Sequence, residues 1–451
     1  MSDIVYRIHE CHTTLFSDVP VGTNLALSHI MWSMYTGNFL PARGSVASAL
    51  YLLGCPDDAI DRSEQALNKG KWAMDTLVKS WREQVLKDPD WKTSCMEGYR
   101  PVAADLTAFY RPKLKGLKTN HYKSEAGKAL PAIVYAIVGD IGQVKNRRFC
   151  LPRELVSHHR EGESEIAFQN RVTISVLSKL KPDEVLVVDR GFSLPELHNA
   201  EKGHYVIRLR QNITLRRNFL PEYKGQGRYP EYGEEVRPQS RKYKDKTIES
   251  TPPDESDEVL KMDQKTGKPY TLRTDIWKEA VLSDAKPGAR TFCCIACFDS
   301  RFKDPMIYGT DLKEVSADTV RHLYGARWGV EHPPLAAKQM LGTERQFVHG
   351  RESRYRLPGI ALLAGSILTF FAAKGLPIAS GKWDRNPKPT CGRLRRYLSK
   401  IHFSDLPFSS ELRKKASDTS KLPSGVKAKS INRERQGKIL PEVDVQAALA
   451  A

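Results

Sequence analysis

The order of predicted elements between residues 99 and 208 constrains the fold of this chain more than any other feature. The segment 102–109 has the composition of a strand, and two further strands follow, which the turn Gly139-Asp-Ile-Gly142 would join into a hairpin. The remaining predicted elements are a helix over 163–180, a strand over 184–189 whose apolar run is of the fully buried kind, a helix over 194–200 and a strand over 204–208. This order predicts a mixed α/β sheet flanked by helices, with an antiparallel portion first.

Changes in composition divide the chain into four predicted regions. Short helices broken by Gly and Pro fill residues 1–96, and they suit either a helix-turn-helix DNA-binding domain or a small helical packing domain. The α/β pattern occupies residues 97–210 and resumes over 289–375. Between them, residues 211–288 are rich in charge and in Gly and Pro, which indicates a β-rich insertion. Residues 376–451 form a basic C-terminal segment.

The net charge indicates the class of partner. The 451 residues include 71 Lys and Arg against 53 Asp and Glu, a formal charge of +18. Such an excess favours a polyanionic partner, nucleic acid before a membrane surface, although a merely soluble basic protein has the same composition. With 40% hydrophobic residues, the chain has enough apolar material for a buried core.

Apolar segments and cysteines indicate a reduced, cytoplasmic protein. Residues 1–10 contain no apolar segment of the kind found in a secretory signal. The apolar run 357–373 is slightly short for a membrane span and contains Pro358 and Gly359, so a buried core helix is expected. Cys294-Ile-Ala-Cys297 has no second pair at zinc-ligand spacing, which favours small apolar residues of a buried strand.

Two acidic residues stand where strands of the predicted sheet could place them together. Asp105 lies in the first strand and Asp189 closes the most apolar one. If these strands are neighbours, both carboxylates project at one sheet edge, and a divalent metal would remove their mutual repulsion. Asp189 could instead cap the next helix. Asp140 is set aside, because it lies in the predicted Gly-Asp-Ile-Gly turn.

A third acid lies on a helix predicted to begin at Ser316, whose hydroxyl can cap the first turn. Tyr324, Arg327 and Glu331 are spaced at i, i+3 and i+7, so they share one helical face. A solvated face with an ordinary charge pair would show the same spacing.

These residues carry a resemblance to a known group of proteins. Tyr324, Arg327, Glu331 and Lys338 match the Tyr-x2-Arg-x3-Glu-x6-Lys signature of bacterial and archaeal insertion-sequence transposases with a DDE, RNase H-like catalytic domain. Asp189-Arg-Gly-Phe192 resembles the second-Asp motif of that group, and Asp105 stands where the first Asp belongs. The long interval before Glu331 looks like the β-strand insertion of these enzymes. The resemblance covers about residues 97–375.

The resemblance implies roles for six residues. Asp105, Asp189 and Glu331 would be the catalytic residues and the ligands of two Mg²⁺ ions, with Mn²⁺ as a possible substitute. Tyr324, Arg327 and Lys338 would contact DNA. The sequence departs from a regular helix at Pro333-Pro334. These prolines leave open whether Lys338 shares the helix face of Glu331 or lies on a second helix.

The expected function is that of a DNA transposase. It would cleave double-stranded DNA at the terminal inverted repeats of an element and transfer the strand into target DNA, as a homodimer that joins the two ends in a synaptic complex, without a membrane. Two alternatives stay open at this point. One is a related metal-dependent nuclease without strand transfer, and the other is a catalytically dead DNA-binding descendant.

Overall fold

The computed structural model describes residues 2–20, 22–117, 119–158, 160, 162–200, 202–223, 225–244, 246–263 and 266–400. Its centre is a mixed sheet whose main strands lie in the order β5-β4-β2-β6-β7. They are β2 (Arg100–Tyr110), β4 (Lys128–Val144), β5 (Arg147–Ser157), β6 (Glu184–Val188) and β7 (His204–Arg208). β4 is antiparallel to β2 and β5, whereas β6 is parallel to β2 and β7. The predicted RNase H-like mixed sheet is therefore confirmed.

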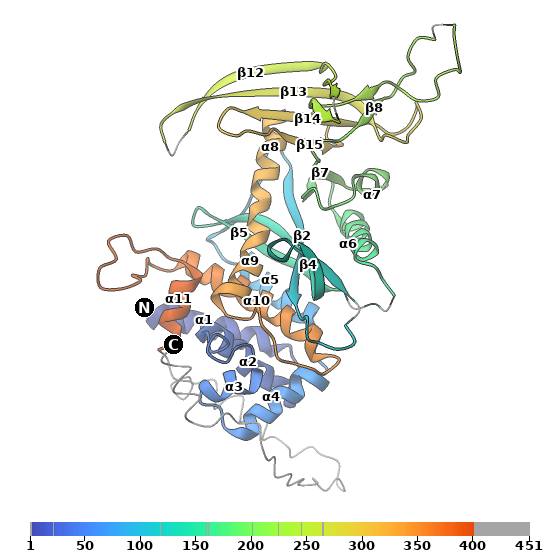
Figure 1. Cartoon of the computed structure of the whole chain (residues 1–451). Helices are drawn as coiled ribbons and strands as arrows, with labels where there is room; N and C mark the ends of the chain where they lie inside the picture. The colour runs from blue at the N-terminus through green and yellow to red at the C-terminus, as the bar shows by residue number, and fades with distance from the viewer. Residues whose placement is uncertain are drawn as a thin grey trace.

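The sheet continues beyond β7 through antiparallel strands (Figure 1). In spatial order these are β15 (Met306–Thr310), β14 (Phe292–Asp299), β13 (Pro269–Val281), β8 (Leu215–Arg217) and β9 (Glu235–Val236). β12 (Glu255–Met262) forms a long hairpin with β13, and β10 (Arg241–Tyr243) pairs only with β11 (Lys246–Ile248). β1 (Trp91–Thr93) and β3 (Asn120–Lys123) pair with β4. The insertion thus extends the central sheet rather than packing on it as a separate layer.

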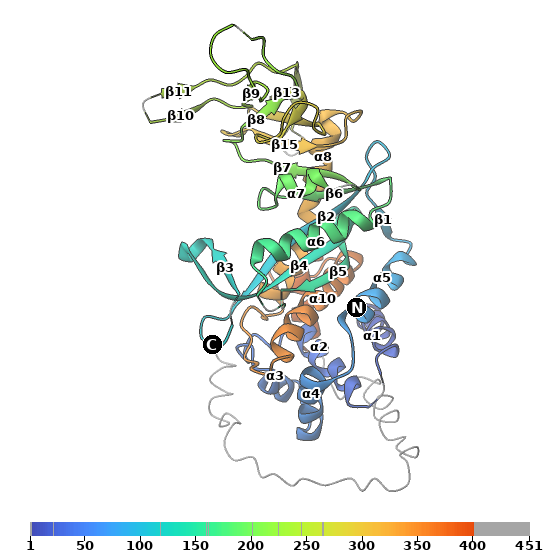
Figure 2. The same cartoon turned by 90° about the vertical axis from the view of Figure 1, so that its right-hand side faces the viewer.

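The two faces of β2 belong to two different hydrophobic clusters. Even-numbered residues such as Ala104 and Ala108 pack with α6 (Glu165–Lys179) and α7 (Leu194–Asn199). Odd-numbered residues such as Phe109 join the cluster that contains α10 (Ser353–Lys374). Figure 2 shows α6 and α10 on opposite sides of the strands. Because side chains alternate along a strand, the odd-numbered Asp105 belongs to the α10 side.

The N-terminal helices share one hydrophobic cluster with α10 and with the sheet. They are α1 (Ser2–Ser17), η1 (Thr23–Ala26), α2 (Leu27–Thr36), α3 (Val46–Leu52), α4 (Asp57–Lys69) and α5 (Met74–Leu86). α11 (Cys391–Leu398) packs on the same cluster, and η2 (Ser124–Ala126) is a single turn. The Trp81 indole N–H donates to the Ser366 hydroxyl at 3.2 Å, which joins α5 to α10. These helices therefore pack as part of the main body.

Two apolar segments are buried as the sequence predicts. Among the residues with described coordinates, one helix, α10, has the length and hydropathy of a membrane span, and 89% of its apolar window is buried inside the protein. Cys293, Cys294 and Cys297 are buried on β14. The basic run 413–415 of the C-terminal segment lies outside the described residues.

The predicted hairpin turn at Gly139–Gly142 is wrong. β4 passes straight through these residues, and the reversal occurs at Lys145 and Asn146, both at positive φ as a two-residue primed turn requires. Gly139 is needed for close packing instead, since a Cβ there would lie 2.4 Å from the Cys150 sulfur. Asp140 is consequently a buried strand residue.

Candidate active site

Parallel pairing of β2 with β6 brings Asp105 and Asp189 to the same level of the sheet. Ala103 pairs with Val187, and two residues further along each chain stand Asp105, still within β2, and Asp189, directly after β6. Both carboxylates therefore lie at the carboxyl end of β6, where open α/β sheets commonly bind ligands.

The third acid comes from a helical stretch that changes type three times. It consists of α8 (Ala317–Ala326), the 3₁₀ turn η3 (Arg327–Glu331), α9 (His332–Leu335) and the π-helical turn η4 (Ala336–Met340). The Ser316 hydroxyl accepts from the Thr319 N–H at 3.2 Å, which confirms the predicted cap. Glu331 closes η3, the 3₁₀ turn that contacts β2.

Side chains from this stretch join the three carboxylates. The Tyr324 hydroxyl donates to Asp189 Oδ1 at 2.9 Å. One terminal nitrogen of Arg327 donates to Glu331 Oε1 at 2.7 Å, and the other lies 3.5 Å from Asp105 Oδ2. The Arg327 side chain is only 4% exposed. Tyr324 and Arg327 of this helix face are therefore buried, and they contact Asp105 within β2 and Asp189 after β6.

The prolines do not interrupt the helical backbone. Pro333 and Pro334 occupy the first turn of α9, where a missing N–H removes little, and the residues that flank the turn keep right-handed helical angles. Lys338 lies one turn further on, in η4. Its ammonium is 5.3 Å from the centre of the Phe109 ring, on the same face of β2 as Asp105. Lys338 therefore remains beside the carboxylates despite the change of helix type.

Burial and charge set the ionisation of the site. Burial raises the pKa of Asp105 to about 6; the Arg327 charge opposes this increase, and the carboxylates of Glu331 and Asp189 add to it. Burial also lowers the pKa of Lys338 to about 8. Asp105 therefore interacts electrostatically with Arg327, Glu331, Asp189 and Lys338.

The donor set suits a hard divalent cation, although Arg327 now occupies its place. Carboxylate oxygens are the ligands that Mg²⁺ and Mn²⁺ prefer. Burial, and to a smaller extent the carboxylates of Glu331 and Asp189, raise the pKa of Asp105, and a bound cation would favour its ionised form. As the side chains stand, no group of three or more His, Cys, Asp or Glu in the described chain is spaced to hold a metal ion. The guanidinium between Asp105 and Glu331 would have to move for a cation to be held there.

Two residues were judged differently from sequence. Phe109, whose ring lies beneath Lys338, has no motif of its own in the sequence, and only two-residue alternation from Asp105 would place it on the same face. Asp140, set aside as a turn residue, forms buried ion pairs with Arg82 and Arg153. It connects α5 to the sheet and does not contact the carboxylates of the site.

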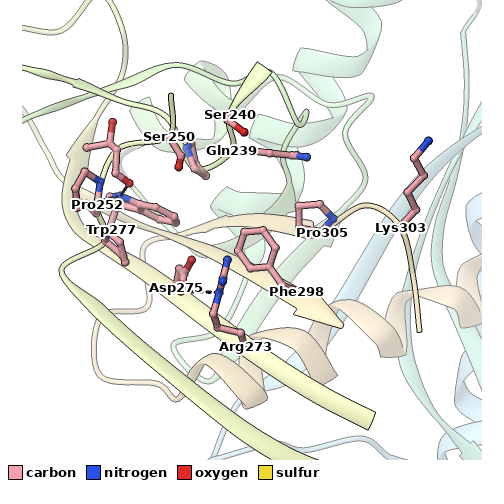
Figure 3. A pocket seen from close by; sticks show the side chains of 13 residues that line it. Gln239, Ser240, Ser250, Pro252, Arg273, Asp275, Trp277, Phe298, Lys303 and Pro305 are labelled. Carbon is pink, nitrogen blue, oxygen red and sulfur yellow. Dashed lines mark hydrogen bonds and ion pairs between the residues drawn. The ribbon is translucent and has the colours of Figure 1, made fainter. Parts of the chain in front are cut away.

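A cavity of about 400 Å³ lies in the insertion, away from this site (Figure 3). Its walls include Arg273, Phe298 and Lys303, but none of the six residues of the site. Trp277 is 1% exposed and donates its indole N–H to the Pro252 carbonyl at 3.0 Å. It is a core residue at the edge of the cavity.

Comparison with known families agrees with the geometry of the site. Residues 166–364 match the model of a family described as the transposase DDE domain. The match supports a relationship to DDE transposases over these residues. Asp189 and Glu331 lie within the matched residues, whereas Asp105 precedes them on β2. No curated protein matches the chain.

Proposed function

We propose that this protein is a cut-and-paste DNA transposase that cleaves DNA at the ends of an element and joins the freed 3′ end to target DNA. The observation that carries the proposal is the meeting of Asp105, Asp189 and Glu331 around Arg327 in a chain that matches the transposase DDE domain over residues 166–364. Cleavage and joining would be successive in-line displacements at phosphorus in this one site.

Asp105, Asp189 and Glu331 would hold two Mg²⁺ ions, or Mn²⁺ in their place. Bound ions of this kind activate the attacking oxygen and stabilise the leaving oxygen of a phosphodiester. The protein contributes the three carboxylates from β2, from the end of β6 and from η3, so the site depends on the whole fold. The Tyr324 hydroxyl, bonded to Asp189, would fix the orientation of that carboxylate.

Arg327 and Lys338 would contact the DNA backbone. The Nε and one terminal nitrogen of Arg327 are buried and form no hydrogen bond within the described chain, so the guanidinium has donors to offer to a phosphate. If the Arg327 guanidinium bound a phosphate instead of the carboxylates of Asp105 and Glu331, it would also leave the space between them. Lys338, lying over Phe109, would supply a second positive charge along the same strand.

The remaining regions would serve recognition and assembly. We assign residues 1–96 to the reading of terminal inverted repeats, and the net charge of +18 supports binding to double-stranded DNA. Residues 97–210 and 289–375 would form the catalytic domain, with 211–288 as the insertion and 376–451 as a basic segment. Two copies of the chain would hold the two ends in a synaptic homodimer, acting on the nucleoid DNA of the cytoplasm.

The proposal predicts that Glu331→Ala abolishes cleavage while binding to the element ends survives. The substitution removes a carboxylate from the site but leaves the N-terminal helices unchanged. Glu314→Ala is the matched control, because Glu314 is an exposed acid in the loop before α8. Cleavage by Glu331→Ala at the wild-type rate would refute the assignment. Cleavage without joined products would indicate a nuclease rather than a transposase.

A further inference from the structure

A second cationic site lies on the same face of the sheet as the carboxylates. Arg111 directly follows β2, and its backbone N–H donates to the Pro131 carbonyl at 2.7 Å, which continues the pairing with β4. Its side chain therefore follows Asp105 and Phe109 in the alternation toward α10. One terminal nitrogen donates to the Val348 carbonyl at 2.9 Å.

The other terminal nitrogen of Arg111 has no hydrogen-bond partner among the residues that the structure describes. Arg111 is 7% exposed, and its Nη1 is buried without a hydrogen bond within the described chain. Leaving a charged donor buried and unsatisfied is costly, and few native side chains do so without a ligand. Arg111 therefore has a buried donor available to an acceptor that the described residues do not provide.

The positive charge of Arg354, close to Arg111, further favours an anionic acceptor at this position. Burial lowers the pKa of Arg111, and the positive charge of Arg354 lowers it further. Arg354 lies in the first turn of α10, half-buried, and its Nε is also buried without a hydrogen bond. Neither arginine forms an ion pair with a carboxylate of the described residues. Two adjacent like charges with free donors favour an anion between them.

The position of the pair suggests which anion. Six residues separate Arg111 from Asp105 along β2, a span of about 20 Å at the rise of an extended strand. Lys338 lies between them, over Phe109. The span corresponds to about six nucleotides of helical rise in one strand of duplex DNA. A line of cations thus leads away from the carboxylates along one face of the sheet.

We propose that Arg111 and Arg354 form a binding site for a phosphate of the DNA backbone, about six nucleotides from the scissile bond. The identification of the ligand as DNA rests on the function proposed above. The ability of the two arginines to bind a phosphate does not. Arg111 would give a buried, charge-assisted contact and Arg354 would close over the phosphate from the exposed side. The contact would be independent of base sequence and would fix how far the duplex extends across the sheet.

Binding of the full-length protein to a random-sequence duplex, followed by fluorescence anisotropy in EDTA over a range of salt concentrations, tests this site. Arg111→Met keeps the length of the side chain without its charge, and Arg354→Gln changes a half-buried residue that the fold tolerates more easily. Arg100→Gln is the matched control, since Arg100 lies at the opposite end of β2 and pairs with Asp183. The increase in melting temperature caused by inorganic phosphate measures phosphate binding independently for the wild type and the three variants.

We expect Arg111→Met and Arg354→Gln each to reduce the log–log salt slope by about 0.9 relative to Arg100→Gln. Inorganic phosphate should bind them at least about tenfold more weakly than wild type. Salt slopes equal to that of Arg100→Gln would overturn the site. Loss of inorganic phosphate binding with an unchanged salt slope would also overturn it, because the two arginines would then bind free phosphate and not DNA. Reduced slopes in a protein that never cleaves DNA would uphold the site and contradict the proposed function.

Discussion

Asp105→Asn should stabilise the metal-free protein at neutral pH and have little effect in acid. Burial, with a smaller contribution from the neighbouring carboxylates, raises the pKa of Asp105 to about 6 in the folded chain, against 3.8 for an ordinary aspartate. The folded protein therefore binds the Asp105 proton more tightly than the unfolded chain. Linkage requires that its free energy of unfolding falls as pH rises from about 4 to about 6.

The size of the effect follows from the two pKa values. A difference of about two pH units corresponds to about 3 kcal/mol, and the 29% exposure of the Asp105 side chain reduces this to about 2–3 kcal/mol. An asparagine has no charge to desolvate, so the variant lacks this loss. At about pH 4 wild type and variant should be equally stable, and at about pH 7 the variant should be more stable by that amount.

Urea unfolding of both proteins in EDTA, followed by tryptophan fluorescence between pH 4 and 7, measures the difference. Asp384→Asn is a control of opposite sign, because hydrogen bonds from Ser380 lower the pKa of Asp384 to about 2 and its substitution should destabilise at neutral pH. MgCl₂ should stabilise wild type more than Asp105→Asn. A stability difference that does not change with pH would refute the reasoning that burial raises the pKa of Asp105.

Three further substitutions test separate parts of the account. Arg327→Ala should reduce the log–log salt slope of binding to the element ends by about 0.9, measured by anisotropy, and an unchanged slope would remove Arg327 from the phosphate contacts. Asn146→Val should destabilise the protein by about 1–2 kcal/mol in urea unfolding while Asn146→Gly should not, because only the former strains the left-handed turn between β4 and β5. Ser316→Ala should cost about 1 kcal/mol by removing the cap of α8; no loss in the same assay would contradict the cap.

The sequence predicts the elements of the site because its signals are local. The apolar run 184–189 predicts β6 to within one residue, and the hydroxyl of Ser316 predicts the start of α8. Helical spacing also predicts that Arg327 meets Glu331 four residues later. It cannot predict that Arg327 is buried and reaches Asp105, since that contact depends on η3 packing against β2.

The features that the sequence does not predict depend on contacts between residues far apart in the chain. Gly139 and Gly142 resemble a turn, yet they are glycines because neighbouring strands approach closely there, and the true turn at Lys145 contains no glycine. The predicted N-terminal helices occur, but their packing against α10 rests on pairs such as Trp81 and Ser366. No spacing rule reports a contact between residues so far apart.

The most direct test of the central claim is a cleavage assay on a plasmid that carries the gene with its native flanking DNA. Purified protein is incubated with Mg²⁺, with EDTA, and as the Glu331→Ala variant with Mg²⁺. The account predicts Mg²⁺-dependent cuts at both edges of an inverted repeat, absent in EDTA and in the variant, together with joined products. Specific binding to those edges without any cutting by the wild-type protein would contradict it and indicate a DNA-binding descendant without catalytic activity.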